Sequence, residues 1–341
     1  MVDIVDRSDD YEELKRHYES LTEEIQFLQN SDRTDDLSPR DRFRLRKQIS
    51  EAKVERTQVE QQLKDSEKDL EVGNSTAGAE DVYLMLRRLG YQQQIRLFRQ
   101  TIESEPIAAF LIHGYPEHGQ SWLLNRIVVQ YVPYFLTGKV IGVHASRKIR
   151  QNDASALWRE VAGRVGLRGR QYTPSEIAQQ VGQCLSTQNV LLVFHDVEIL
   201  PEATLHELIQ DFWLPLVNEV QAQLSSQGKE QSKYKLLMFL IDYEGCVEES
   251  EVLFAEKLDE SWKSTVPIKS PKITEFSDGD LLDWVEAEFD RLPPALTARV
   301  DDEVRAILES TENGIPELVL DVICNYCGFD WYEESKKWLN L

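Results

Sequence analysis

Apolar positions recur every three or four residues along the first seventy positions of the chain. One such series runs over Tyr11–Leu28, and a second, which includes Arg56 and Ser66, runs over Leu45–Leu70. This spacing places apolar side chains on one face of a helix. A polar, helix-breaking stretch separates the two series. The pattern predicts two helices that pack as an antiparallel coiled-coil hairpin over residues 8–71.

The second series is longer than the first, so the first helix covers only part of the second. A second copy of the chain or a helix of another protein would fit the remaining apolar seam. A closed hairpin with a solvated end is the alternative, because such pairs are marginal by themselves. The hairpin is therefore predicted to bind an effector protein, with a homo-oligomer as a further expectation.

The pattern changes after a flexible linker at residues 72–80, which is rich in small residues. Short apolar runs without alternation follow, as in strands that are buried on both faces. They are predicted at Ala108–Ile112, Val140–Ala145, Val190–Phe194 and Lys235–Ile241, with a last short strand at Lys269–Phe276. Helical stretches separate them. Residues 81–276 therefore form an α/β domain with a parallel sheet, covered on both faces.

The helices of this domain follow from the same periodicity. They are predicted at Asp81–Glu103 with a break near Gly90, at Trp122–Val132, Ala154–Val165 and Pro174–Leu185, and at Ala203–Leu224 with a kink at Pro215. Residues 277–341 form a C-terminal helical region, with helices at Asp278–Asp290, Leu296–Ser310, Pro316–Cys327 and Trp331–Leu339.

A glycine-bearing loop follows the first predicted strand. Gly114 and Gly119 are separated by four residues, and Gln120, Ser121 and an apolar helix come next. Strand, glycine loop and helix are the layout of a P-loop, whose backbone N–H groups and helix N-terminus hold phosphates. Gln120 stands where the usual motif has a lysine, and its neutral amide supplies no positive charge. Ser121 keeps the hydroxyl that binds Mg²⁺ in such loops. A purely structural glycine turn is the alternative.

A second strand ends in an acidic residue. Four apolar residues precede His195 and Asp196, as in a Walker B strand, where Asp196 would face Ser121 across a Mg²⁺ ion. The catalytic glutamate that normally follows is absent, and Glu198 comes one position later. An aspartate that caps the next helix is the alternative. Lys139, Arg147 and Lys148 are the cations that could stand in for the missing lysine.

The charge, the apolar runs and the cysteines of the chain argue against several classes of function. The 341 residues carry a net charge of −22 and a hydrophobic share of 41%. That charge opposes nucleic-acid binding, and no apolar run is long enough to cross a membrane. An acidic N-terminus and four cysteines predict a cytoplasmic protein with reduced thiols.

Two other groups of residues, a cysteine pair and three histidines, are of types that can carry chemistry. Cys324 and Cys327 form a C-x-x-C within a predicted apolar helix, with no second pair, so core cysteines are favoured over a zinc or redox site. His113, His118 and His195 all lie near the loop end of the strands. Without a carboxylate partner in the sequence, we interpret them as incidental.

The α/β region resembles the inactive STAND domain, a degenerate relative of the STAND signal-transduction P-loop ATPases. The residues that carry the resemblance are Leu89–Gln94 and Phe98, the degenerate P-loop, the strand that ends in His195 and Asp196, Leu237–Asp242, Val266–Ile268, Ile273–Phe276, Asp280, Leu281 and Trp284. It covers about Asp81–Leu341. Gly314, Ile315 and Pro316 also resemble the G-x-P motif of active STAND proteins, in which the proline lies near the adenine.

The resemblance implies a function. Inactive STAND domains occur in bacterial multidomain signalling and conflict proteins, and the hairpin is similar to the effector-associated domains fused to them. The resemblance implies that the protein is a non-catalytic adaptor without a cofactor. A degenerate nucleotide site would comprise Gly114, Gly119, Gln120, Ser121, Asp196 and Pro316. Weak ATP binding with Mg²⁺, or an active ATP or GTP switch with a substitute lysine or arginine, is the alternative.

Overall fold

The structure, a computed structural model, describes residues 78–145, 154–185, 187–226, 234–247, 254–259 and 261–339, with separate residues between 15 and 63. The chain divides into two compact units, Met1–Glu80 and Asp81–Leu341. Most of the predicted hairpin and linker lie outside the described residues. Among those described, no helix is long and apolar enough to cross a membrane.

Described residues of the first unit gather in one small apolar cluster. Tyr18 and Leu21 come from the first predicted helix, and Val59 and Leu63 come from the second; all four are buried. The two apolar series therefore supply residues to the same cluster. The length and direction of the hairpin stay a prediction.

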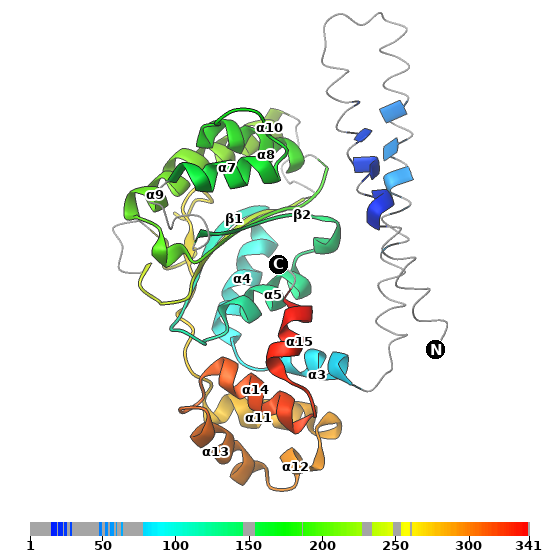
Figure 1. The fold of residues 1–341 in the computed structure, drawn as a ribbon, viewed down its shortest axis with the longest axis vertical. Coiled ribbons are helices and arrows are strands. Elements are labelled where there is room, and N and C mark those ends of the chain that lie inside the picture. The colour runs from blue at the N-terminus through cyan, green and yellow to red at the C-terminus, as the bar shows by residue number, and fades with distance from the viewer. Residues whose placement is uncertain are drawn as a thin grey trace, which may run out of the picture. The chain divides into compact units, whose positions relative to one another are not determined.

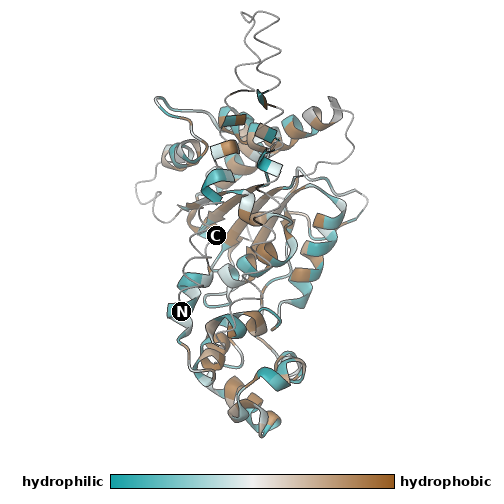
Figure 2. Ribbon diagram, turned by 90° about the vertical axis from the view of Figure 1, so that its right-hand side faces the viewer, coloured by the Kyte–Doolittle hydropathy of each residue, from teal (hydrophilic) through white to brown (hydrophobic). Residues whose placement is uncertain are grey.

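The second unit is built on five parallel strands in the order β2-β3-β4-β1-β5. The strands are β1 (Ile107–His113), β2 (Lys139–His144), β3 (Val190–His195), β4 (Leu236–Asp242) and β5 (Ile268–Lys269). Every residue of β1, β3 and β4 is buried. The predicted parallel sheet is confirmed, and Figure 2 shows these strands as a hydrophobic centre.

Helices cover both faces of the sheet, as Figure 1 shows. On one face lie α4 (Gln92–Ser104) and α5 (Gln120–Tyr131), and on the other lie α7 (Ala154–Arg164), α8 (Pro174–Leu185) and α10 (Leu214–Ser226). Alternate strand residues enter the two cores: Leu191 and Val193 pack on the α4–α5 side, Leu192 and Phe194 on the other. This is the three-layer α/β arrangement that the apolar runs predict.

The predicted helix Ala203–Leu224 is divided into three segments. They are α9 (Glu202–Glu207), a π-helix (Leu208–Trp213) and α10. Pro215 is the second residue of α10, so the irregular segment ends just before it. A proline ring and its missing N–H account for a break at this place.

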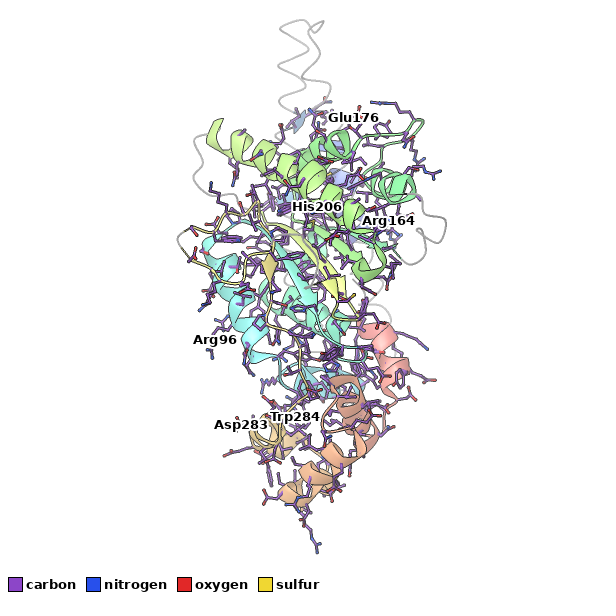
Figure 3. The ribbon with its side chains drawn as sticks, turned by 90° about the vertical axis from the view of Figure 1, so that its left-hand side faces the viewer. Arg96, Arg164, Glu176, His206, Asp283 and Trp284 are labelled. Atoms are coloured by element: carbon purple, nitrogen blue, oxygen red, sulfur yellow. The ribbon has the colours of Figure 1, made fainter. Side chains whose placement is uncertain are left out.

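The C-terminal region is helical, as predicted. Its helices are α11 (Asp278–Glu288), α12 (Pro294–Thr297), α13 (Val300–Ser310), α14 (Pro316–Tyr326) and α15 (Trp331–Trp338), and they share a core with α3 (Ala79–Leu86) and α5. Trp284 of α11, labelled in Figure 3, donates its indole N–H to the carbonyl of Met85, 2.9 Å away. Trp331 lies edge-on to Trp122 of α5, with 5.3 Å between ring centroids. The C-terminal helices are thus anchored on the helix that follows the glycine loop.

Candidate functional site

The glycine loop lies where the carboxyl ends of the central strands meet. β1 ends at His113, which is in register with Asp242 of β4, and Ile241 is in register with His195 of β3. The loop runs from Gly114 to Gly119, and α5 begins directly after it. The crevice outside the carboxyl ends of parallel strands is where such sheets bind ligands. The carboxyl end of the sheet, around this loop, is therefore the candidate site.

Gly119 is required by its surroundings. It precedes α5 in a left-handed conformation, with φ at 74°. A Cβ atom there would collide with the hydroxyl of Tyr91. That hydroxyl donates to the carbonyl of His118 at 3.1 Å. The loop is thus held from outside by a buried tyrosine, and burial raises the pKa of Tyr91 well above its usual value.

The Gln120 side chain turns into the loop rather than toward solvent. It is 1% exposed. Its amide nitrogen donates to the carbonyl of Tyr115 at 2.9 Å and to that of Asp242 at 3.4 Å. The Tyr115 carbonyl oxygen therefore points toward the position of the usual lysine. An anion at that place would meet a carbonyl oxygen instead of a positive charge.

Pro316 and its neighbour close the loop from a second side. Pro316 is the first residue of α14 and is buried. The backbone N–H of Glu317 donates to the carbonyl of Glu117 at 2.9 Å, so this helix N-terminus binds a protein carbonyl. Burial, together with the nearby Glu117, raises the pKa of Glu317. The side chain that α14 brings to the loop at this point is thus acidic.

A tyrosine from the next loop occupies the place between Ser121 and the third strand. The hydroxyl of Tyr243 lies 2.7 Å from Ser121 Oγ and 2.8 Å from His195 Nδ1. Three elements are joined there: the start of α5, the end of β3 and the residue after β4. The serine predicted to bind Mg²⁺ has a phenol as its partner.

His195 supplies a hydrogen bond from the end of β3 to Tyr243. His195 continues the alternation of Leu191 and Val193 on the α5 side of the sheet, and its ring reaches Tyr243. Asp196 follows in a left-handed conformation, and its carboxylate lies 3.7 Å from His144 Nδ1 at the end of β2. The residue that faces Ser121 is therefore an imidazole. Burial, then the neighbouring His144, lowers the His195 pKa to about 4.

The Asp242 carboxylate holds Tyr243 in place. It is fully buried and accepts the backbone N–H groups of Glu244, Gly245 and Val247 at 3.0, 2.8 and 2.8 Å. Glu198 accepts the N–H of Tyr243 at 3.3 Å, and burial raises the Glu198 pKa to about 7. The turn that carries the phenol is thus held by the carboxylates of Asp242, at the end of β4, and Glu198, in the 3-10 helix Val197–Ile199 after β3.

These residues do not fit a magnesium–triphosphate group. Such a site needs a cation at the lysine position and oxygen ligands for Mg²⁺. The structure has a buried amide at the first position and a Ser121–Tyr243–His195 chain at the second. Lys139 is the first residue of β2 and so lies at the amino end of the sheet, whereas the candidate site lies at the carboxyl end. It therefore cannot replace the lysine. Arg147 and Lys148 lie outside the described residues.

Comparison with known proteins agrees with this geometry. Residues 86–241 match the family model described as inactive STAND. The chain carries an inactive STAND domain. The match runs from α3 to β4 and includes the glycine loop and the strand that ends in His195. A comparison with curated proteins finds no match.

The remaining candidate residues of the inactive STAND domain and its C-terminal helices have structural partners. His113 Nε2 lies 2.9 Å from the carbonyl of Ser270, and His118 Nδ1 lies 3.0 Å from that of Pro116. Cys324 is buried, which raises its pKa to about 12, and Cys327 is half-buried. Within the described part of the chain, no group of three or more metal-ligating side chains could hold a metal ion.

The structure brings Gly114, Gly119, Gln120, Ser121 and Pro316 together around the loop and leaves Asp196 beside β2. Sequence reasoning missed Tyr243. The signal that it left is an aromatic residue directly after a buried strand that ends in aspartate. Strand alternation also indicates that His195 and Asp196 cannot both face α5, but the sequence does not say which of them does.

Proposed function

We propose that this chain is a non-catalytic signalling adaptor of a bacterial conflict or signalling system. The inactive STAND domain serves as the scaffold, and the segment 8–71 couples it to an effector protein. The observation that supports this proposal is the Tyr243 hydroxyl, which bonds Ser121 and His195 at the place where a nucleotide-bound Mg²⁺ would lie. The buried Gln120 amide adds to it, because it supplies no charge for a phosphate.

A nucleotide titration tests the first half of the proposal. Calorimetry of the full chain with ATP–Mg²⁺ and with GTP–Mg²⁺ is expected to give no binding heat, and phosphate release is expected to equal that of buffer. Tight binding with turnover that disappears in Asp196→Asn would instead establish an NTP-driven switch with a cation supplied elsewhere.

A substitution in the first unit tests the second half. Leu63 is 2% exposed within the apolar cluster, whereas Thr57 is exposed. Leu63→Asp in the full chain is expected to abolish self-association in light scattering and co-purification of a helical partner encoded beside this chain. Thr57→Asp is the matched control. Because all seven tryptophans lie beyond residue 80, unchanged tryptophan fluorescence verifies that the second unit stays folded. Assembly that survives Leu63→Asp rules out the hairpin as the coupling element.

A further inference from the structure

A cavity at the amino end of β1 is the feature that the adaptor function leaves unexplained. Its volume is about 530 Å³, which is within the range of small-molecule sites. Glu105 lies on its wall between α4 and β1, and Leu214 and Asn218 come from α10. Trp262 and Lys263 come from the segment before β5. The glycine loop follows the carboxyl end of β1, so the cavity is a separate site.

Hydrogen bonds hold the segment before β5 against α10. The indole N–H of Trp213, the last residue of the π-helix, donates to the carbonyl of Ser264 at 3.0 Å. The Gln221 amide donates to the Ser264 hydroxyl, also at 3.0 Å. The Trp262 indole donates to the carbonyl of Val266 at 3.0 Å, which fixes its ring on the wall. π-Helical segments frequently occur at functional sites. The cavity is thus shaped before a ligand enters.

Polar side chains on the wall are available to a ligand. Within the part of the chain that the structure describes, four of them make no hydrogen bond or ion pair: Glu105, Asn218, Lys263 and Thr265. Lys235 lies near Glu105, but its ammonium group donates to two backbone carbonyls at the end of α4 instead of the carboxylate. A carboxylate, an amide, an ammonium and a hydroxyl group therefore line one cavity without described partners.

The two charges on the wall select the ligand. Glu105 and Lys263 line the same cavity, yet they do not form an ion pair with each other. An anion would meet the carboxylate of Glu105, and a cation would meet the ammonium of Lys263. A molecule that carries both charges complements both residues. Such a zwitterion has no net charge, so the net charge of −22 on the chain does not repel it.

We propose that this cavity binds a small zwitterion of the α-amino-acid class with an apolar side chain. The Glu105 carboxylate accepts from the ligand's ammonium group, and Lys263 and the Thr265 hydroxyl donate to its carboxylate. The ligand's side chain packs on Trp262 and Leu214. Polar groups set orientation and apolar contact adds affinity in sites of this kind. The proposal does not depend on the glycine loop, so amino-acid and nucleotide titrations can fail separately.

Calorimetry of the full chain with L-leucine, L-methionine and L-phenylalanine tests the proposal. At least one of them is expected to bind with a dissociation constant below about 1 mM. N-acetylation removes the ammonium charge and amidation removes the carboxylate charge. Each such analogue of the amino acid that binds is expected to bind at least about tenfold more weakly. No binding of all three amino acids at about 10 mM, or equal binding of either analogue, overturns the proposal.

A substitution of Glu105 locates the ammonium group of the ligand. Glu105→Gln keeps the size of the side chain and is expected to weaken binding of the amino acid at least about tenfold. It is also expected to bring the amino acid and its N-acetyl analogue to similar affinities. Glu103→Gln is the matched control, because Glu103 is exposed on α4 and does not line the cavity. Equal affinities of the two variants contradict the assignment.

A substitution of Lys263 tests the other charge. Lys263→Gln is expected to weaken binding at least about tenfold and to abolish the difference between the amino acid and its amide. Lys257→Gln is the matched control, because Lys257 is exposed and lies outside the cavity. An unchanged thermal midpoint verifies that each variant is folded. An amino acid that binds to Lys263→Gln as tightly as to Lys257→Gln has its carboxylate elsewhere, which would refute the site.

Discussion

Replacement of Tyr243 by phenylalanine is the most direct test of the site. The substitution keeps the ring and removes two hydrogen bonds, to Ser121 at 2.7 Å and to His195 at 2.8 Å. A neutral hydrogen bond contributes about 1 kcal/mol, and a buried polar group left without its partner costs about 1–3 kcal/mol. His195 is 5% exposed, and Nε2 of its ring has no hydrogen-bond partner among the described residues. The expected loss of unfolding free energy is about 2–3 kcal/mol.

Urea denaturation followed by tryptophan fluorescence measures this loss. All seven tryptophans lie beyond residue 80, so the signal reports the second unit alone. Tyr332→Phe is the matched control, because Tyr332 is 49% exposed. It is expected to change the unfolding free energy by less than about 0.5 kcal/mol. If Tyr243→Phe is no more destabilising than this control, the hydroxyl does not join the strand ends as argued.

A double-mutant cycle separates the hydrogen bond from general packing. Ser121→Ala removes the same bond as Tyr243→Phe from the other side, so the double variant should lose less stability than the sum of the two single variants. A coupling of about 1 kcal/mol is expected for groups in direct contact. Additivity within about 0.3 kcal/mol would refute the bond between Ser121 and Tyr243.

Three further predictions follow from single residues. Burial raises the Glu198 pKa from its ordinary 4.5 to about 7, so ionisation of Glu198 lowers the free energy of unfolding as the pH rises through this range. After allowance for solvent screening, the unfolding free energy of the wild type should fall by about 1 kcal/mol relative to that of Glu198→Gln between pH 5 and pH 8, as measured by urea titrations. No pH dependence in that difference would contradict it. Gly314→Ala, at a φ of 103° where a Cβ would collide with the Phe276 carbonyl, should lower stability by about 3 kcal/mol or more, whereas Gly163→Ala on α7 should raise it by about 0.5 kcal/mol. Similar thermal midpoints would refute this. A maleimide should modify exposed Cys246 before buried Cys324, and mass spectrometry of partly labelled protein would reveal the reverse order.

The sequence predicts most of the fold because its apolar runs are unambiguous. Runs such as Leu191–Phe194 have no polar residue to allow a solvated face, and their short length favours strands buried on both sides over buried helices. The sequence does not predict the order of the strands in the sheet. Nothing local states that β4 lies between β1 and β3, since that arrangement depends on how helices pack on both faces. The hairpin was predicted from periodicity alone and remains a prediction.

The candidate site depends on that strand order, which is why the sequence reveals only half of it. Gly119, Gln120 and Ser121 form a local motif that can be read directly. Tyr243 is a distant residue that reaches Ser121 because β4 is the immediate neighbour of β1 and of β3. A lysine restored at position 120 alone would therefore meet the Tyr115 and Asp242 carbonyls, and Tyr243 would still bond Ser121. Because three strand ends contribute to this arrangement, the single substitution Gln120→Lys is expected to leave ATP binding absent in calorimetry.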